Sequence, residues 1–228
     1  MTGPEQKGAP PCGLYLIMPQ GWMEPDFLKN LRDLFRSINA SRYEKNSHVI
    51  EFRAEDRKYG AEEMDIIRAL AELTKSQGII FIVGNNIALA KTCAADGVML
   101  EDAAQIEEAR REMGEDAIVG VRCGQSRRLA EKALEHGIDC VSFYEPLGGL
   151  IDPGIIEWWH YKTGEACLIE GRITNDDCAF YVAAGADFID ASHYVWNHPK
   201  GVMQGVVNMM HAIDIALDAQ NENSRKAL

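Results

Sequence analysis

Short apolar segments alternate with amphipathic segments along almost the whole chain. The apolar segments lie at 14–18, 49–53, 79–83, 97–100, 118–121, 140–143, 167–169 and 188–190. The segments with helical spacing of apolar residues lie between and after them, at 27–38, 61–76, 87–94, 103–113, 126–136, 155–161, 175–184 and 202–219. Because parallel strands need crossover connections, usually helices, this alternation predicts a parallel sheet with helical crossovers.

Two features favour a closed barrel over an open, doubly wound sheet. Eight strand–helix pairs can be counted, and a weak repeat places an aspartate before a strand at Asp96, Asp139 and Asp187. The open Rossmann-like sheet is the alternative, but no Gly-x-Gly-x-x-Gly follows any predicted strand. We therefore predict a single (β/α)8 TIM barrel over 13–219, with a disordered lead-in at 1–12 and a frayed tail at 220–228. Its ligand site is expected at the carboxyl ends of the strands.

Charge and composition narrow the possible partners. The net charge of −12, from 35 acidic and 23 basic residues, predicts that the chain binds neither nucleic acid nor anionic membranes. No apolar run approaches the ~18 residues of a membrane span. The six cysteines form no Cys-x-x-Cys pair, and the amino-terminal residues lack the order of a signal peptide. A cytoplasmic protein with free thiols is the expectation.

The segment from Gly171 to Asp177 is the best candidate for phosphate binding. A glycine at a strand end lets a ligand approach the backbone, and Thr174 is in the position of a helix N-cap, with Asp177 three residues later. A helix that begins here could hold phosphate through its free N–H groups. Barrels often complete such a site after the last strand, which adds Ser192 and His193. The alternative is a well-capped helix without a ligand.

Charged residues on two strands are candidates for catalysis. Glu51 and Arg53 are alternate residues of one strand and therefore face the same side. A charged pair inside a barrel is costly unless it is paired or used. Arg122, at the end of the fifth strand, is likewise a charged residue that must be either paired or used in function. All three are catalytic candidates, and a structural ion pair is the alternative.

Carboxylates after the fourth strand could bind a metal ion. Glu101 and Asp102 offer the oxygen ligands that Mg²⁺ prefers, although their spacing matches no dedicated motif. His193 is a possible acid or base and Cys123 a possible nucleophile, neither with a recognisable partner. The aromatic cluster at 158–161 is a candidate for packing or for the contact of a homo-oligomer.

Four segments together resemble one known family. They are Gly13-Leu14-Tyr15-Leu16-Ile17, Ala94-Ala95-Asp96-Gly97-Val98-Met99-Leu100, Gly171-Arg172-Ile173-Thr174 and Ala184-Gly185-Ala186-Asp187. In this order they are similar to the thiamine-phosphate synthase and thiazole tautomerase family, over about residues 13–215. The resemblance implies a (β/α)8 barrel that binds a phosphorylated small molecule.

Several polar positions depart from the family pattern. The synthases join a pyrimidine diphosphate to a thiazole phosphate and release pyrophosphate. Their strand motif Gln-Leu-Arg-x-Lys keeps its arginine here as Arg53 but has Glu55 in place of lysine. The second glycine of their Gly-Gly-Ile-Thr is Arg172, the serine after the last strand falls near His193, and the Thr-x-Thr-Lys loop is missing. The histidine that the tautomerases place after the fifth strand is also absent, since Arg122 is followed by Cys-Gly-Gln.

The family's magnesium carboxylates are changed as well. The Asn-Asp after the third strand becomes Gly-Asn, which leaves Asn85 as a candidate ligand for substrate or phosphate, and the aspartate after the fourth strand falls at Ala104. Under the resemblance, Glu101 or Asp102 would replace these carboxylates.

Three hypotheses follow. The first is a divergent thiamine-phosphate-synthase-like transferase, in which Arg53 holds the diphosphate and Arg172 with the Thr174 turn holds the second phosphate. The second is a binding or regulatory barrel that kept the phosphate site and lost catalysis. The third is a different reaction on a phosphorylated ligand, with Glu170, His193 or Cys123 as acid, base or nucleophile.

Overall fold

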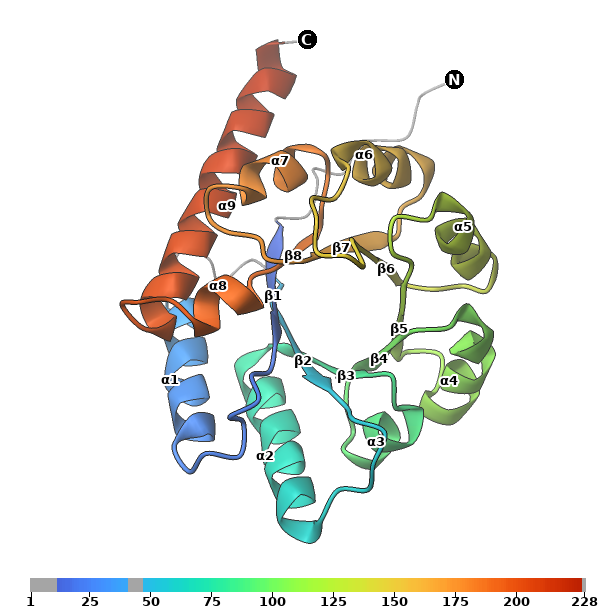
Figure 1. Cartoon of the computed structure of the whole chain (residues 1–228), viewed down its shortest axis with the longest axis vertical. Helices are drawn as coiled ribbons and strands as arrows, with labels where there is room; N and C mark the ends of the chain where they lie inside the picture. Colours follow the sequence, from blue (N-terminus) through green and yellow to red (C-terminus); the bar gives the residue numbers. More distant parts are fainter. Residues whose placement is uncertain (1–11, 41–46, 227–228) are drawn as a thin grey trace.

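The eight predicted strands form a closed parallel barrel. The computed structural model describes residues 12–40 and 47–226. The strands pair in the order β1 to β8, and β8 pairs with β1 to close the ring (Figure 1). Their bounds are β1 Gly13–Ile17, β2 Val49–Arg53, β3 Ile80–Gly84, β4 Gly97–Leu100, β5 Ile118–Arg122, β6 Cys140–Tyr144, β7 Ala166–Glu170 and β8 Phe188–Asp190. The predicted (β/α)8 architecture is confirmed.

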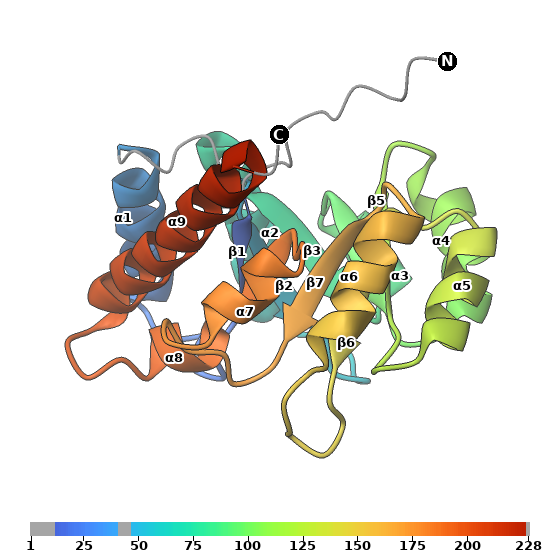
Figure 2. The same ribbon diagram turned by 90° about the horizontal axis from the view of Figure 1, so that it is seen from above.

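The helices surround the barrel of strands (Figures 1 and 2). They are α1 Phe27–Asn39, α2 Ala61–Gln77, α3 Ile87–Thr92, α4 Ile106–Met113 after the 3₁₀ turn η1 Ala103–Gln105, α5 Arg127–Glu135, α6 Pro153–Lys162, α7 Cys178–Ala183, α8 Ser192–Trp196 and α9 Val202–Lys226. In α1 the buried residues Leu31, Leu34, Phe35 and Ile38 follow the helical period. The same period predicted this helix from the sequence.

The predicted limits of the domain need adjustment at both ends. Cys12 is buried in the core, although it was assigned to the lead-in; residues 1–11 lie outside the described part. Helix α9 continues to Lys226, beyond the Ala219 boundary at which a frayed tail was expected. The polar composition after Gln220 hid this continuation, since a helix end can extend into solvent without an apolar face.

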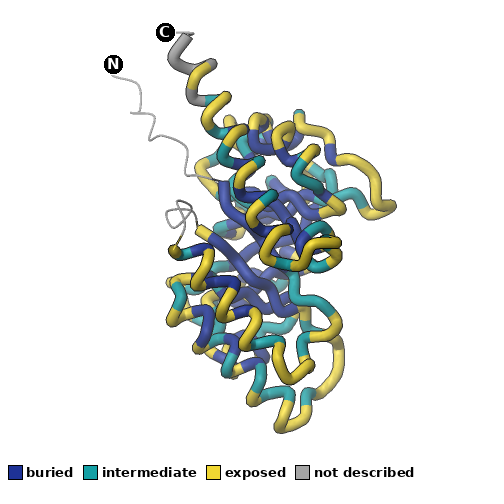
Figure 3. The backbone as a smooth tube through the Cα atoms, turned by 90° about the vertical axis from the view of Figure 1, so that its left-hand side faces the viewer, coloured by how far each residue is buried: buried dark blue, intermediate teal, exposed yellow. Residues whose placement is uncertain are grey.

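Apolar side chains divide into two clusters. The larger one fills the space between the strands and the helices, and the strands are the most buried part of the chain (Figure 3). The smaller cluster lies inside the barrel and consists of Tyr15, Val49, Ile82, Met99, Cys140 and Leu168. The inward-facing residues nearer the carboxyl ends, two positions further along β2, β6 and β7, are polar: Glu51, Ser142 and Glu170. The barrel is therefore apolar at one depth and polar at the next.

The predicted aromatic cluster is split between core and surface. Trp159 is fully buried, donates from Nε1 to the carbonyl of Glu165 at 2.9 Å and packs against the Phe143 ring at 6.2 Å. Tyr161 is almost fully exposed. The 158–161 segment therefore does not form one exposed contact patch.

The described cysteines, from Cys12 to Cys178, are all buried, and Cys93, Cys123, Cys140, Cys167 and Cys178 are free thiols, as expected. Within the described ranges no helix combines the length and apolar character needed to cross a bilayer.

Replacing Trp159 with alanine should lower the free energy of unfolding by about 3–5 kcal/mol, because it leaves a large cavity and an unpaired carbonyl. Urea denaturation monitored by circular dichroism measures the change. Tyr161→Ala is the matched control and should stay within about 0.5 kcal/mol of the parent protein. An equal loss in both variants would contradict the assignment of Trp159 to the core.

Candidate functional site

Arg122, at the end of β5, is the centre of a buried charge network inside the barrel. Its Nη2 lies 2.8 and 2.6 Å from the two carboxylate oxygens of Glu51, and its Nε lies 2.8 Å from Glu170 Oε1. Nη1 reaches Glu101 at 3.3 Å, and the Arg122 side chain is only 4% exposed. Burial lowers the pKa of this guanidinium, but the Glu51 and Glu170 carboxylates outweigh burial and hold the pKa above its ordinary value.

Glu51 is completely buried and has several donors. Besides Arg122 it accepts the Tyr15 hydroxyl at 2.9 Å and lies 3.4 Å from Arg53 Nε. Burial first, and then the Glu51 carboxylate, raise the pKa of the Tyr15 hydroxyl, so Tyr15 stays neutral and donates. Gly84 makes this arrangement possible, because a Cβ at that position would lie 2.3 Å from Glu51 Oε1.

Glu170, at the end of β7, joins the remaining members of the network. It accepts from the Ser142 hydroxyl, from Arg122 Nε and from Arg53 Nη2 at 2.5 Å. Burial alone would raise the pKa of this carboxyl, but Arg122 and Arg53 outweigh it and hold the pKa below its ordinary value. Arg53 is 46% exposed and lies at the edge of the network. Two guanidiniums and two buried carboxylates therefore neutralise one another across β2, β5 and β7.

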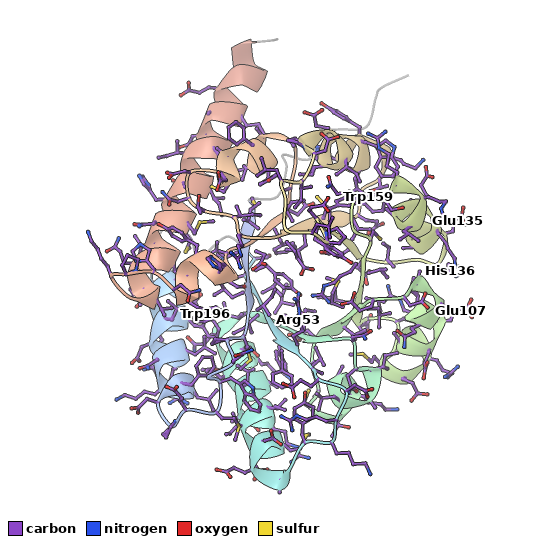
Figure 4. The ribbon with its side chains drawn as sticks, in the orientation of Figure 1. Arg53, Glu107, Glu135, His136, Trp159 and Trp196 are labelled. Carbon is purple, nitrogen blue, oxygen red and sulfur yellow. The ribbon has the colours of Figure 1, made fainter. Side chains whose placement is uncertain are left out.

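A cavity of about 520 Å³ opens above this network at the carboxyl ends of the strands. Its lining is polar around the strand ends and apolar along the loop between β6 and α6, which extends beyond the barrel (Figure 2). The lining residues are Arg53, Glu101, Arg122, Tyr144, Glu145, Gly148, Gly149, Leu150, Ile151, Glu170, Gly171, Arg172, Ile173, Asp177, Tyr181 and Asp190. Figure 4 labels Arg53, which lies within the ring of strands. A volume of this size suits a small-molecule ligand.

Of the arginines in the lining, Arg172 is the one without a partner. It is exposed, and it forms no ion pair or hydrogen bond with any described residue. The backbone N–H groups of Arg172 and Ile173 likewise donate to no described acceptor. Free N–H groups beside a guanidinium are suited to an anion.

The helix start predicted directly after Thr174 is wrong, although the Thr174 hydroxyl accepts the Asp176 N–H at 3.3 Å as a cap would. Helix α7 begins at Cys178, and the Thr174 hydroxyl donates to the Asp177 carboxylate at 2.6 Å, which also accepts the Thr174 N–H. Threonine and aspartate side chains can bond to nearby backbone and so compete with a helix start. The result is a turn followed by a six-residue helix, not a helix that starts at Asn175.

The structure brings some predicted residues to the cavity and places others elsewhere. Those in the lining are Arg53, Arg122, Glu101, Gly171 and Arg172, with Glu51 directly behind them. Ser192 is buried and accepts the Ile17 N–H at 2.6 Å, and Asn85 Oδ1 accepts the Glu101 N–H at 3.2 Å. His193 is exposed on α8 and does not line the cavity.

Asp190 lines the cavity but was not among the predicted site residues. It ends β8 and accepts both the N–H and the hydroxyl of Ser192 on Oδ1. Burial raises the pKa of its carboxyl to about 6, against the hydrogen bonds from Ser192, which lower it. The signal in the sequence was an acid at the end of a short apolar strand.

The two carboxylates predicted to bind magnesium both have partners within the protein. Asp102 Oδ1 accepts the Ala104 N–H at 2.9 Å at the start of η1, and Glu101 pairs with Arg122. Among the residues that the structure describes, no group of three or more His, Cys, Asp or Glu side chains is placed to hold a metal ion. The cationic side chains of the described cavity lining are arginines.

The fold and the cavity define a (β/α)8 barrel with a charged cavity at the carboxyl ends of its strands. The sequence model of the family described as thiamine monophosphate synthase matches residues 14–144. The chain belongs to this family.

Relatives along the whole barrel agree with the assignment. The thiamine-phosphate synthase of Rhodospirillum centenum is 33% identical over 208 residues, which is 86% of this chain and 95% of the relative. That of Erythrobacter litoralis is 32% identical over 201 residues, 82% of this chain and 89% of the relative. The solved thiamine phosphate pyrophosphorylase of Pyrococcus furiosus has a TM-score of 0.73 at 19% identity, covering 91% of this chain and 98% of that one, and shows the shared fold.

Arg122→Ala should destabilise the protein by about 3–5 kcal/mol, because Glu51 and Glu170 would remain as two buried charges with only the half-exposed Arg53 to compensate them. Chemical denaturation of the single variant and of Arg122→Met with Glu51→Gln and Glu170→Gln tests this. Removing the charges together should recover most of the loss. A triple variant no more stable than Arg122→Ala would contradict charge imbalance as the cause.

Asp190→Asn should change how stability depends on pH. The folded pKa of about 6 lies above the unfolded value of 3.8, so the folded protein binds more protons between these values and the parent protein loses stability as pH rises through this window. The asparagine can keep both bonds from Ser192 through Oδ1 but carries no charge. The stability of the variant relative to the parent should rise by about 2–3 kcal/mol from pH 4 to pH 6.5, measured by denaturation at each pH. A constant difference would contradict the raised pKa.

Proposed function

We propose that the chain is a thiamine-phosphate-synthase-like transferase that acts on phosphorylated heterocycles in thiamine biosynthesis. The observation that carries the proposal is that Arg53, Arg122 and Arg172, from three separate strand ends, reach one cavity of about 520 Å³. Guanidiniums are the side chains best matched to phosphate oxygens. Family membership supplies the chemistry to which this geometry is applied.

In this proposal Arg172 holds the phosphate of one substrate. Its guanidinium is free, and the neighbouring N–H groups of Arg172 and Ile173 are unoccupied by any described acceptor. Gly171 leaves the backbone accessible at the end of β7. The heterocyclic ring of the other substrate lies against the apolar side of the cavity, which Leu150 and Ile151 form.

Arg53 holds the diphosphate of the other substrate. Its side chain is half-exposed at the edge of the network, so it can face the cavity without leaving the barrel. Negative charge grows on the departing diphosphate in the transition state, where a fixed guanidinium stabilises it. Arg122 is buried behind Arg53 and acts by holding Glu51 and Glu170 in place.

A second candidate is a barrel that binds a phosphorylated ligand without catalysing a reaction. The specific observation in its favour is that Arg53 and Arg122 are already neutralised by Glu51 and Glu170. A diphosphate must compete with Glu170 for Arg53, whereas a single phosphate on Arg172 competes with no described side chain.

The test is formation of thiamine phosphate by the purified protein from the pyrimidine diphosphate and the thiazole phosphate, with and without magnesium. We expect turnover that falls at least about 100-fold in Arg53→Ala and in Arg172→Ala, the range seen when a group that stabilises transition-state charge is removed. Arg128→Ala, an exposed arginine of α5 outside the cavity, is the matched control and should keep full activity.

Absence of turnover in folded protein would contradict the transferase. Calorimetric titration with the thiazole phosphate then separates the remaining cases. Binding that Arg172→Ala abolishes would support the non-catalytic barrel, and absence of binding would contradict both candidates.

A further inference from the structure

A second cavity lies outside the barrel and differs in character from the first. It has a volume of about 510 Å³ and opens between the β1–α1 loop, α1 and the start of α9, next to α8. It shares no lining residue with the barrel cavity. Its lining is mainly apolar and consists of Pro19, Gly21, Glu24, Phe27, Asn30, Leu31, Asp33, Leu34, Trp196, Val202 and Met203. Apolar walls with a few polar groups are typical of small-molecule sites.

The aromatic wall of this cavity is held in place before any ligand binds. Trp196 donates from Nε1 to the carbonyl of Ile17 at 2.7 Å, and its ring lies 6.2 Å from that of Phe27. The N–H of Ile17 in turn donates to the Ser192 hydroxyl. A side chain fixed in this way loses little conformational entropy when a ligand packs against it. Figure 4 labels Trp196 beside α8, well apart from Arg53 in the barrel.

The polar groups in the lining select a positive charge. The side-chain carboxylates of Glu24 and Asp33 form no ion pair or hydrogen bond with any described group, and no lysine, arginine or histidine lines the cavity. A cation beside these carboxylates and the Trp196 face would gain both charge attraction and a cation–π contact. An anion would be repelled, so the phosphorylated ligands of the barrel cavity do not suit this site.

We infer that the cavity between α1 and α9 is a second ligand site, which binds a small organic cation with an aromatic or compact apolar body. The apolar walls take the body of the ligand, and the carboxylates of Glu24 and Asp33 face its positive charge. The inference is independent of the proposed function, because it uses none of the residues of the barrel cavity.

The experiment uses the full chain and three probes of similar shape: benzyltrimethylammonium, benzyl alcohol and benzoate. Calorimetric titration should show the cation binding at least about tenfold more tightly than the neutral alcohol, with no binding of benzoate. In ¹⁵N spectra, the indole N–H resonance of Trp196, assigned with Trp196→Phe, should shift on titration, and that of the buried Trp159 should not.

Two pairs of variants locate the site. Met203→Trp fills the cavity and should abolish binding, whereas Val207→Trp, at an exposed position on the next turn of α9 outside the lining, should not. Glu24→Gln with Asp33→Asn should weaken binding of the cation at least about tenfold. Asp26→Asn, a carboxylate of the same loop outside the lining, should leave the affinity unchanged.

The inference is overturned if the cation and the alcohol bind equally, if Met203→Trp still binds the cation, or if the Trp196 resonance does not move. It is also overturned if sedimentation shows a dimer of the parent chain that Met203→Trp dissociates, because a second copy of the chain would then cover this face.

Discussion

The contact between Arg122 and the carboxylates of Glu51 and Glu170 organises the carboxyl half of the barrel. Three strands contribute to it, and each charge is out of water. Buried ions are stable only when their partners and hydrogen bonds are complete. Arg53, Tyr15 and Ser142 supply further donors, and Gly84 leaves the room that Glu51 needs. The floor of the cavity is therefore rigid, with a charge that is balanced before a ligand arrives.

This balance sets the cavity apart from a simple anion site. Its lining has three guanidiniums but five carboxyl groups, from Glu101, Glu145, Glu170, Asp177 and Asp190. A polyanion gains little from arginines that are already paired, because it must replace one carboxylate with another. Arg172 is unpaired among the described residues, so the cation available to a ligand lies at the rim above β7. In the proposed reaction, Arg53 exchanges Glu170 for the diphosphate of a substrate.

The alternation of strands and helices could be predicted from the sequence. Each unit buries a short apolar strand and one apolar face of a helix, and both leave a recognisable spacing of apolar residues. The shared direction of Glu51 and Arg53 followed from strand geometry alone. The start of α7 could not be predicted, since Thr174 and Asp177 bond to each other and to the turn with the same groups that would cap a helix. The structural use of the Ser192 hydroxyl was equally hidden, because its partners, Ile17 and Asp190, meet only when the barrel closes.

The closure of the barrel between β1 and β8 also connects the two cavities through hydrogen bonds. A continuous set of hydrogen bonds runs from Trp196 through the carbonyl and N–H of Ile17 to Ser192, and from its hydroxyl to Asp190. Trp196 lines the outer cavity and Asp190 the barrel cavity. Asp190 can ionise near neutral pH, so the charge at the barrel end of this set varies with conditions, while the outer end is a neutral indole. The pairing of β1 with β8 thus fixes one wall of each cavity, through the two peptide groups on either side of the Ile17 Cα.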